Sequence, residues 1–113
     1  MILELRNRTA DTVITYFHRT RDPEVRRHLP QKTATESDAL ADFEKTQQPG
    51  ATSYGRTIYA DGSYIGDIWC YCIQQEERHA MVSYCIFDKT YWGKGVATKA
   101  LEMFLIEIKE RFG

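Results

Sequence analysis

Long apolar runs, an even number of cysteines and an excess of charge of either sign are all missing from this 113-residue sequence. A membrane-spanning helix needs roughly 20 apolar residues, and no run approaches that length. The segment Met1–Arg6 holds an early acid and no long apolar stretch, so it lacks the pattern of a signal peptide. Neither a membrane span nor a signal peptide is expected.

Charge is nearly balanced, with 15 Lys and Arg against 16 Asp and Glu and a net charge of -1. A protein that binds nucleic acid through a strongly basic surface is therefore not expected. A local group of bases at Arg19, Arg21, Arg26 and Arg27 is interpreted as the solvated face of a helix. The hydrophobic fraction of 42% supports one packed core, and the length fits a single domain over residues 1–113.

The three cysteines, Cys70, Cys72 and Cys85, form no even disulfide framework. Reduced thiols are typical of the cytoplasm, which is the expected location. Together with His79 they raise the question of a zinc site, but a Cys-x-Cys pair inside a strand is poor geometry for structural zinc. No metal is expected, and small buried side chains account for the cysteines.

Three helices are predicted in the first half, after a short strand at Met1–Arg6. Thr9 or Asp11 can cap the first helix. Asp22-Pro23-Glu24 starts a second, which Pro30 keeps short. A third helix opens at Thr35-Glu36-Ser37-Asp38 and stops at Gln47–Gly50. Leu40 and Phe43 are spaced to face the core together.

The second half changes to a strand pattern. Ser53–Tyr59 and Tyr64–Ile73 are predicted strands, and Asp61-Gly62 between them is a strong hairpin signal. After a polar link at Gln74–Arg78, Ala80–Phe87 is a further strand. Val96–Phe112 is the clearest helix, with apolar residues at helical spacing. This order predicts the α/β class, of the α+β type, with a mixed but mostly antiparallel sheet flanked by helices.

The most informative feature is the junction where the strand ending at Phe87 leads through Gly93 and Gly95 into the helix that begins at Val96. The first amide hydrogens of a helix lack internal partners and carry partial positive charge, so a helix start can bind phosphate. The two glycines remove side chains that would block the approach. A simpler interpretation is that they only permit a tight connection, and no complete phosphate-loop or dinucleotide motif is present.

The residues around the glycine turn resemble a known phosphate-binding motif. Trp92-Gly93-Lys94-Gly95-Val96-Ala97 resembles the pyrophosphate motif Gln/Arg-x-x-Gly-x-Gly/Ala of the GNAT family of N-acetyltransferases, with Gly95 and Ala97 at the small positions. Trp92 stands where Gln or Arg is more general, as is typical of a branch similar to the ribosomal-protein alanine N-acetyltransferases. Asp22–Pro30 and Ile65–Ile68 also resemble that branch, and the resemblance covers the chain in the right order.

The resemblance implies acetyl-CoA as co-substrate. Main-chain amides of the turn would bind the pyrophosphate, Lys94 would add a cation, and the strand at Tyr84–Ile86 would pair with the pantetheine arm and polarise the thioester carbonyl. The implied cofactor-binding residues are Tyr84, Cys85, Ile86, Trp92, Gly93, Lys94, Gly95, Val96, Ala97 and Thr98. An amine would then attack the acetyl group directly. The acceptor stays open, from a protein N-terminus to a polyamine, an aminoglycoside or an amino acid.

The attacking amine also requires a proton acceptor. Family members often carry a Glu on the strand at Ala80–Phe87, but this strand has no carboxylate. Asp67, which interrupts an apolar run, is the first candidate base, and His79 is the second. The alternatives are that Asp67 points to solvent and that His79 sits in a loop.

The sequence ends at Gly113, just after the long helix. The usual family domain continues with further strands, so residues 1–113 are expected to form a C-terminally incomplete domain. This leaves a second hypothesis beside the enzyme, a module that binds CoA or a protein partner without transferring an acetyl group. It also predicts that the strand at Ala80–Phe87 is an exposed edge and that the chain forms homo-oligomers.

Overall fold

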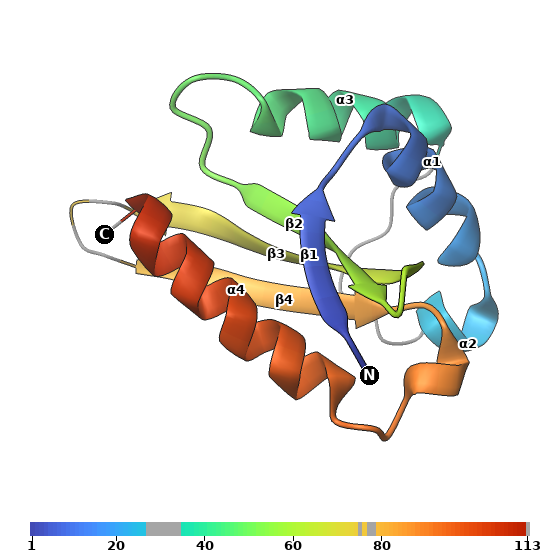
Figure 1. Ribbon diagram of the computed structural model, residues 1–113. Coiled ribbons are helices and arrows are strands. Elements are labelled where there is room, and N and C mark those ends of the chain that lie inside the picture. The colour runs from blue at the N-terminus through green and yellow to red at the C-terminus, as the bar shows by residue number, and fades with distance from the viewer. Residues whose placement is uncertain (27–34, 75, 77–78, 113) are drawn as a thin grey trace.

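A four-stranded sheet with strand order β1-β2-β3-β4 forms the centre of the protein. The computed structural model describes residues 1–26, 35–74, 76 and 79–112 (Figure 1). Every strand pair within these residues is antiparallel. The α+β class predicted from the sequence is confirmed, with an antiparallel rather than a mixed sheet. Parts of two predicted segments, Arg27–Pro30 and Gln75 with Glu77–Arg78, lie outside the described residues.

Three helices follow β1 (Leu3–Asn7): α1 (Ala10–Arg19), α2 (Pro23–Arg26) and α3 (Glu36–Thr46). Their starts have the expected caps. Thr9 forms a reciprocal capping box with Thr12, and the Thr35 side chain accepts from the Asp38 amide. Asp22 accepts from the amide of Glu24 at 2.9 Å. These local hydrogen bonds explain why the predicted helix starts match the structure closely.

Two predictions for this half need correction. Leu40 and Phe43 are only half-buried, and α3 contains no buried residue, because it lies over a cavity rather than directly on the sheet. The expected solvated basic face is right for the exposed Arg19 and wrong for Arg21, which is half-buried. The guanidinium of Arg21 lies 4.1 Å from the ring centroid of Phe17, and that of Arg19 lies 4.5 Å from the centroid of Phe87.

A tight hairpin joins β2 (Tyr54–Ala60) to β3 (Ser63–Gln74). Asp61 and Gly62 both have positive φ, 50° and 85°, as the Asp-Gly signal predicts. The register shifts between Ile58 and Tyr59, which are paired with Gly66 and Tyr64. This bulge accommodates an extra residue in β3. As a result Tyr64 lies on the same face as Asp67, although residues three apart normally point to opposite faces.

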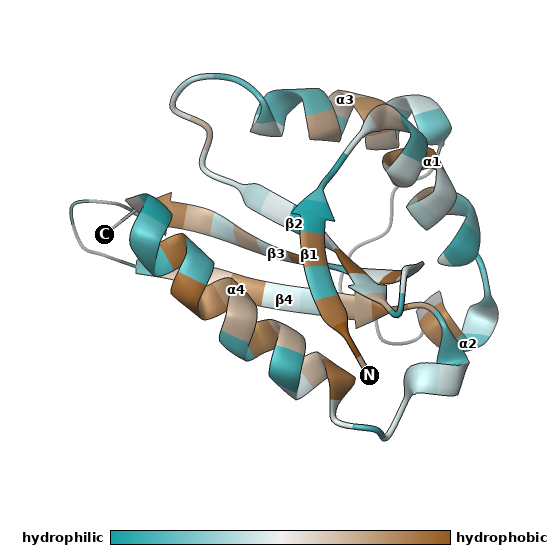
Figure 2. Cartoon of the chain, in the orientation of Figure 1, coloured by the Kyte–Doolittle hydropathy of each residue, from teal (hydrophilic) through white to brown (hydrophobic). Residues whose placement is uncertain are grey.

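The long helix α4 (Val96–Phe112) covers one face of the sheet, and α1 lies on the other (Figure 1). Apolar colour runs along the central strands and α4 in Figure 2. Phe104 is fully buried, and its ring stacks on Tyr54 at 5.9 Å between centroids. The core beneath α4 consists of Ile58, Ala60, Ile65, Ile68, Cys70, Ile86, Val96, Ala100 and Phe104.

The last strand, β4 (His79–Ile86), pairs with β3 on one side only within the described residues. Its other edge, running past Tyr84, has no neighbouring strand there. Met81 and Tyr84 are 49% and 47% exposed. No helix in the described part of the chain is long and apolar enough to cross a membrane.

Candidate active site

The connection from β4 to α4 contains a short 3-10 helix, η1 (Lys89–Tyr91), that the sequence analysis did not predict. Asp88 caps it by accepting from the amide and hydroxyl of Thr90. Trp92 then ends it, and its indole Nε1 donates to the carbonyl oxygen of Ile86 at 2.7 Å. This hydrogen bond fixes the indole beside the end of β4.

The glycine turn follows at once. Gly93 and Gly95 both have φ of +75°, a left-handed conformation that side chains rarely adopt. A Cβ added at either position would meet no atom within 4 Å, so the space in front of the backbone is open. The first amides of α4 begin directly behind this opening. Such a turn at a helix start suits a phosphate group.

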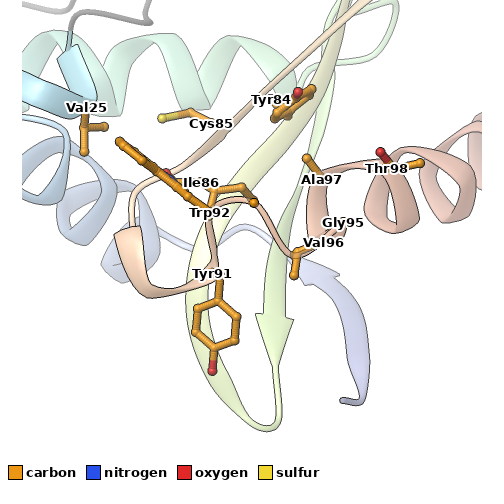
Figure 3. A pocket seen from close by; sticks show the side chains of 11 residues that line it. Val25, Tyr84, Cys85, Ile86, Tyr91, Trp92, Gly95, Val96, Ala97 and Thr98 are labelled. Carbon is orange, nitrogen blue, oxygen red and sulfur yellow. The ribbon is translucent and has the colours of Figure 1, made fainter.

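Between β4, the turn and α2 lies a pocket of about 520 Å³ (Figure 3). Nine of the ten residues predicted to hold the cofactor line it, all except Lys94. The ammonium of Lys94 instead lies 5.9 Å from the ring centroid of Tyr91, itself a lining residue. The last lining residue, Val25, comes from α2. The structure thus brings the predicted residues together around one concave surface.

The pocket has two chemically different ends. Gly93, Gly95, Ala97 and Thr98 lie at the start of α4, where backbone amides carry partial positive charge. Apolar side chains from α2, β4 and the turn line the opposite end, which Figure 3 shows as Val25, Cys85 and the Trp92 ring. An anionic pyrophosphate fits the first end and a largely apolar pantetheine arm fits the second.

Asp67 lies on β3 directly opposite Cys85 of β4 and is only 3% exposed. Its Oδ2 accepts from Arg8 Nε at 3.1 Å, and its Oδ1 accepts from the Tyr64 hydroxyl. Burial raises the pKa of the Asp67 carboxyl, while Arg8 and Tyr64 act in the opposite direction. The expectation that Asp67 could point to solvent is therefore wrong.

Tyr16 links this buried group to the pocket. Its hydroxyl and the Cys85 thiol influence each other's pKa, and its ring meets those of Trp69 and Phe87 edge-on. Burial raises the pKa of Tyr16 well above its ordinary value and that of Cys85 to about 11. Both groups are therefore protonated at neutral pH. Cys85 is a neutral lining residue and has no activated thiolate.

A second, larger cavity of about 1190 Å³ lies between the sheet and helices α1 and α3. Asp67, Trp69 and Ser83 contribute from the sheet, Tyr16 from α1, and Phe43 from α3. Asp67 and Tyr16 thus border this cavity, while their neighbour Cys85 borders the pocket. The two spaces lie on either side of one buried polar cluster, defined here as Arg8, Tyr16, Tyr64, Asp67 and Cys85.

His79 is not brought to this cluster. It is exposed at the start of β4, while Cys85 lies six residues further along the strand. At about 3.3 Å per residue the separation is roughly 20 Å. His79 lines neither cavity. No group of three or more residues of metal-binding type is assembled within the described parts of the chain.

Sequence reasoning missed Val25, Tyr16, Arg8 and Tyr64. Local patterns placed the first two on helices and gave no indication of what they would contact. Arg8 and Tyr64 reach Asp67 across 59 and 3 residues of sequence. The interruption of an apolar strand by a carboxylate was the one available signal, because a buried charge requires partners.

A family model described as an acetyltransferase (GNAT) domain matches residues 3–113. The chain therefore belongs to the GNAT acetyltransferase family. The expected family and fold are confirmed, since fold and family model agree over nearly the whole chain. A search of curated proteins found no match.

Solved structures of N-acetyltransferases share the fold. One is an acetyl transferase from Salmonella typhimurium that modifies the N-terminal serine of 50S ribosomal subunit protein L7/L12, with a TM-score of 0.78 and 18% identity. Another is RimL, a ribosomal L7/L12 alpha-N-protein acetyltransferase, in complex with coenzyme A, with a TM-score of 0.77 and 15% identity. Each match covers 96% of this chain and 64% of the other chain.

A mutant of the spermidine N-acetyltransferase from Vibrio cholerae is also similar, with a TM-score of 0.73 and 16% identity. The match covers 91% of this chain and 60% of that one. The chain thus spans somewhat less than two thirds of the length of these three proteins. At such identities the similarity concerns the fold, and the named acceptors are L7/L12 for two of these proteins and spermidine for the third.

Proposed function

We propose that this protein is an acetyl-CoA-dependent N-acetyltransferase that moves an acetyl group directly to a primary amine. One observation carries the proposal: a single pocket joins an open glycine turn at a helix start to an apolar end at β4. Family membership and a CoA complex of a protein with the same fold support acetyl-CoA as the molecule that binds there. The free cysteines fit a cytoplasmic location.

Backbone amides at the turn and the first turn of α4 would bind the pyrophosphate, and Gly93 and Gly95 would let it approach. The pantetheine arm would lie along the open edge of β4 at Tyr84–Ile86, where its amides could pair with backbone groups. An amide of this strand would also polarise the thioester carbonyl. When bound, acetyl-CoA supplies the activated acetyl group and CoA as the leaving thiol.

The acceptor amine would enter from the second cavity, because Asp67 and Tyr16 border that space and adjoin Cys85. The amine nitrogen would attack the thioester carbon, the carbon–sulfur bond would break, and the electron pair would leave with sulfur. Asp67 is the candidate acceptor for the amine's proton, since burial makes its carboxyl more basic. His79 is not retained in this role, because it lines neither cavity and lies six residues along β4 from Cys85.

A module that binds CoA without catalysis is the second candidate. The observation that favours it is the state of Asp67, whose two oxygens are already engaged by Arg8 and Tyr64. The first pocket has no Asp, Glu or His among its described lining residues. A protein built this way could hold the cofactor and yet lack a free proton acceptor.

Two measurements on the purified chain test the proposal. Calorimetry with CoA and acetyl-CoA tests binding, and detection of free thiol with amines tests transfer. The panel should include a peptide with a free N-terminus, a polyamine, an aminoglycoside and an amino acid. Binding together with amine-dependent thiol release supports the enzyme, whereas binding without release supports the module. An absence of binding to either molecule overturns both.

A further inference from the structure

The apolar end of the pocket is lined by a side chain that the glycine motif does not contain. Val25 is only 1% exposed, yet it lines the pocket opposite the start of α4. It packs in one cluster with Cys85 and Phe87, and Trp92 packs against the same cluster. This end therefore has a wall of side chains that pack against one another.

Polar contacts hold both the Trp92 indole and the helix that carries Val25. The Trp92 indole is held by its hydrogen bond to the Ile86 carbonyl oxygen at 2.7 Å. Lys89, three residues earlier, contacts Asp22 Oδ2 at 2.9 Å and Glu24 Oε1 at 3.2 Å. These ion pairs connect η1 to the helix that carries Val25. They are partly exposed and individually weak, and they add to the packing of Val25 in linking α2 to the turn.

The position of the wall has a consequence if the pocket binds acyl-CoA, so the inference rests on the proposed function. The pyrophosphate requires the amide end, which leaves the apolar end for the arm and the acyl group. We propose that Val25 is a specificity-determining residue that limits the acyl group to a short chain such as acetyl. A longer chain would have to displace a buried, closely packed side chain.

Affinity measurements test this without knowledge of the acceptor. Kd values for CoA, acetyl-CoA and butyryl-CoA would be compared in the wild type, Val25→Ala and Val25→Ile. The wild type should prefer acetyl-CoA over butyryl-CoA by about tenfold or more, the lower bound for a methylene-sized difference in a tight pocket. Val25→Ala should reduce this ratio by about tenfold or more. The Kd for free CoA, measured on the same variant, separates an effect on the pantetheine arm from an effect on the acyl group.

Val25→Ile tests the opposite direction, because the added carbon should weaken acetyl-CoA relative to free CoA. Val82→Ala is the matched control, since Val82 lies on β4, lines neither cavity and packs against the core under α4. It should leave the acetyl-to-butyryl ratio at the wild-type value.

The outcomes distinguish failure of the proposed function from failure of the inference about Val25. If the wild type binds none of the three molecules, the proposed function fails and the inference fails with it. If CoA binds but the acetyl-to-butyryl ratio is the same in wild type and Val25→Ala, only the inference is overturned. Should Val25→Ala fail to fold, an unchanged acetyl-CoA-to-CoA ratio in Val25→Ile overturns it equally.

Discussion

Gly95 illustrates how much of the site depends on single backbone conformations. Its φ of +75° turns the chain into α4, and open space lies where a side chain would project. The effect of a substitution therefore has two parts, which need separate measurement. One is strain in the free protein, about 1–2 kcal/mol for a left-handed non-glycine residue. The other is obstruction of a phosphate in the pocket.

Gly95→Ala should thus be destabilised by about 1–2 kcal/mol, and CoA should bind it much more weakly than the wild type. The matched control is Gly50→Ala, because Gly50 has φ of +77° and equally open space but does not line the pocket. It should show similar strain in chemical denaturation and normal CoA affinity in calorimetry. Equal CoA affinity in both variants and the wild type would exclude the turn as the phosphate site.

Asp67 has to be tested in the light of its ion pair with Arg8. Asp67→Asn leaves the guanidinium without its countercharge, which should destabilise the fold by about 3 kcal/mol. If Asp67 also accepts the amine's proton, turnover should fall by ~10²–10⁴-fold while acetyl-CoA affinity is retained.

The comparison variant is Arg8→Gln, which breaks the same ion pair but keeps the carboxylate. Turnover should fall less in Arg8→Gln than in Asp67→Asn when both are assayed well below their unfolding temperatures. An equal fall would mean that the ion pair shapes the site and that Asp67 is not the base.

The residues of the pocket were predictable from sequence to a degree that depended on their spacing. Residues 84–86 and 92–98 are close in the chain, so one local pattern indicated most of the lining. Val25 and Tyr16 join the site only through the packing of α1 and α2 against β4. The partners of Asp67 depend on the bulge in β3 and on Arg8, and neither has a local signature.

At the scale of elements, local patterns predicted where helices begin and end but not how they pack. The predicted bounds of α4 match the structure because a glycine precedes the helix and its apolar spacing is continuous. Similar spacing in α3 led to an overestimate of burial, since periodicity shows which face is apolar and not how completely it is covered. The three-residue η1 was missed because it has no room for a period.

Helix α4 is attached to β2 by Tyr54, whose hydroxyl donates to Glu107 while Arg56 Nε pairs with Glu107 at 3.0 Å. Burial and this hydrogen bond raise the pKa of Tyr54 from 10.0 to about 12. The raised pKa means that the folded protein holds this proton more tightly than the unfolded chain. The resulting stability is complete below pH 10 and is lost as pH rises through 12.

Tyr54→Phe should remove this alkaline loss. The wild type should lose about 1 kcal/mol of unfolding free energy between pH 10 and 12, a figure reduced for solvent screening of a partly exposed group. The variant should lose less over that interval in urea titrations. Tyr71→Phe, on β3 beside the second cavity, controls for the loss of a hydroxyl. Parallel curves for the wild type and Tyr54→Phe would contradict the assignment.

At the scale of the whole molecule, the edge of β4 that has no partner strand within the described residues is where we expect association. Ala80–Phe87 contains no charged residue, and charges are a common protection of strand edges. Exposed Met81 and Tyr84 add apolar surface to the same strand. Edge-to-edge pairing between two copies is therefore expected.

Light scattering across a dilution series should show a mass that falls with concentration. Met81→Lys places a charge on the strand and should shift the protein towards monomer, whereas Lys89→Arg should have no such effect. A strict monomer at every concentration, with cooperative thermal unfolding, would contradict the predicted self-association.

The edge of β4 also connects two equilibria that are usually considered separately. The backbone groups at Tyr84–Ile86 can pair with a pantetheine arm or with the strand of a second copy, but not with both at once. By mass action, each occupant then raises the apparent dissociation constant of the other. The assembly state of the protein would in that case depend on the cofactor concentration, and the measured cofactor affinity would depend on the protein concentration.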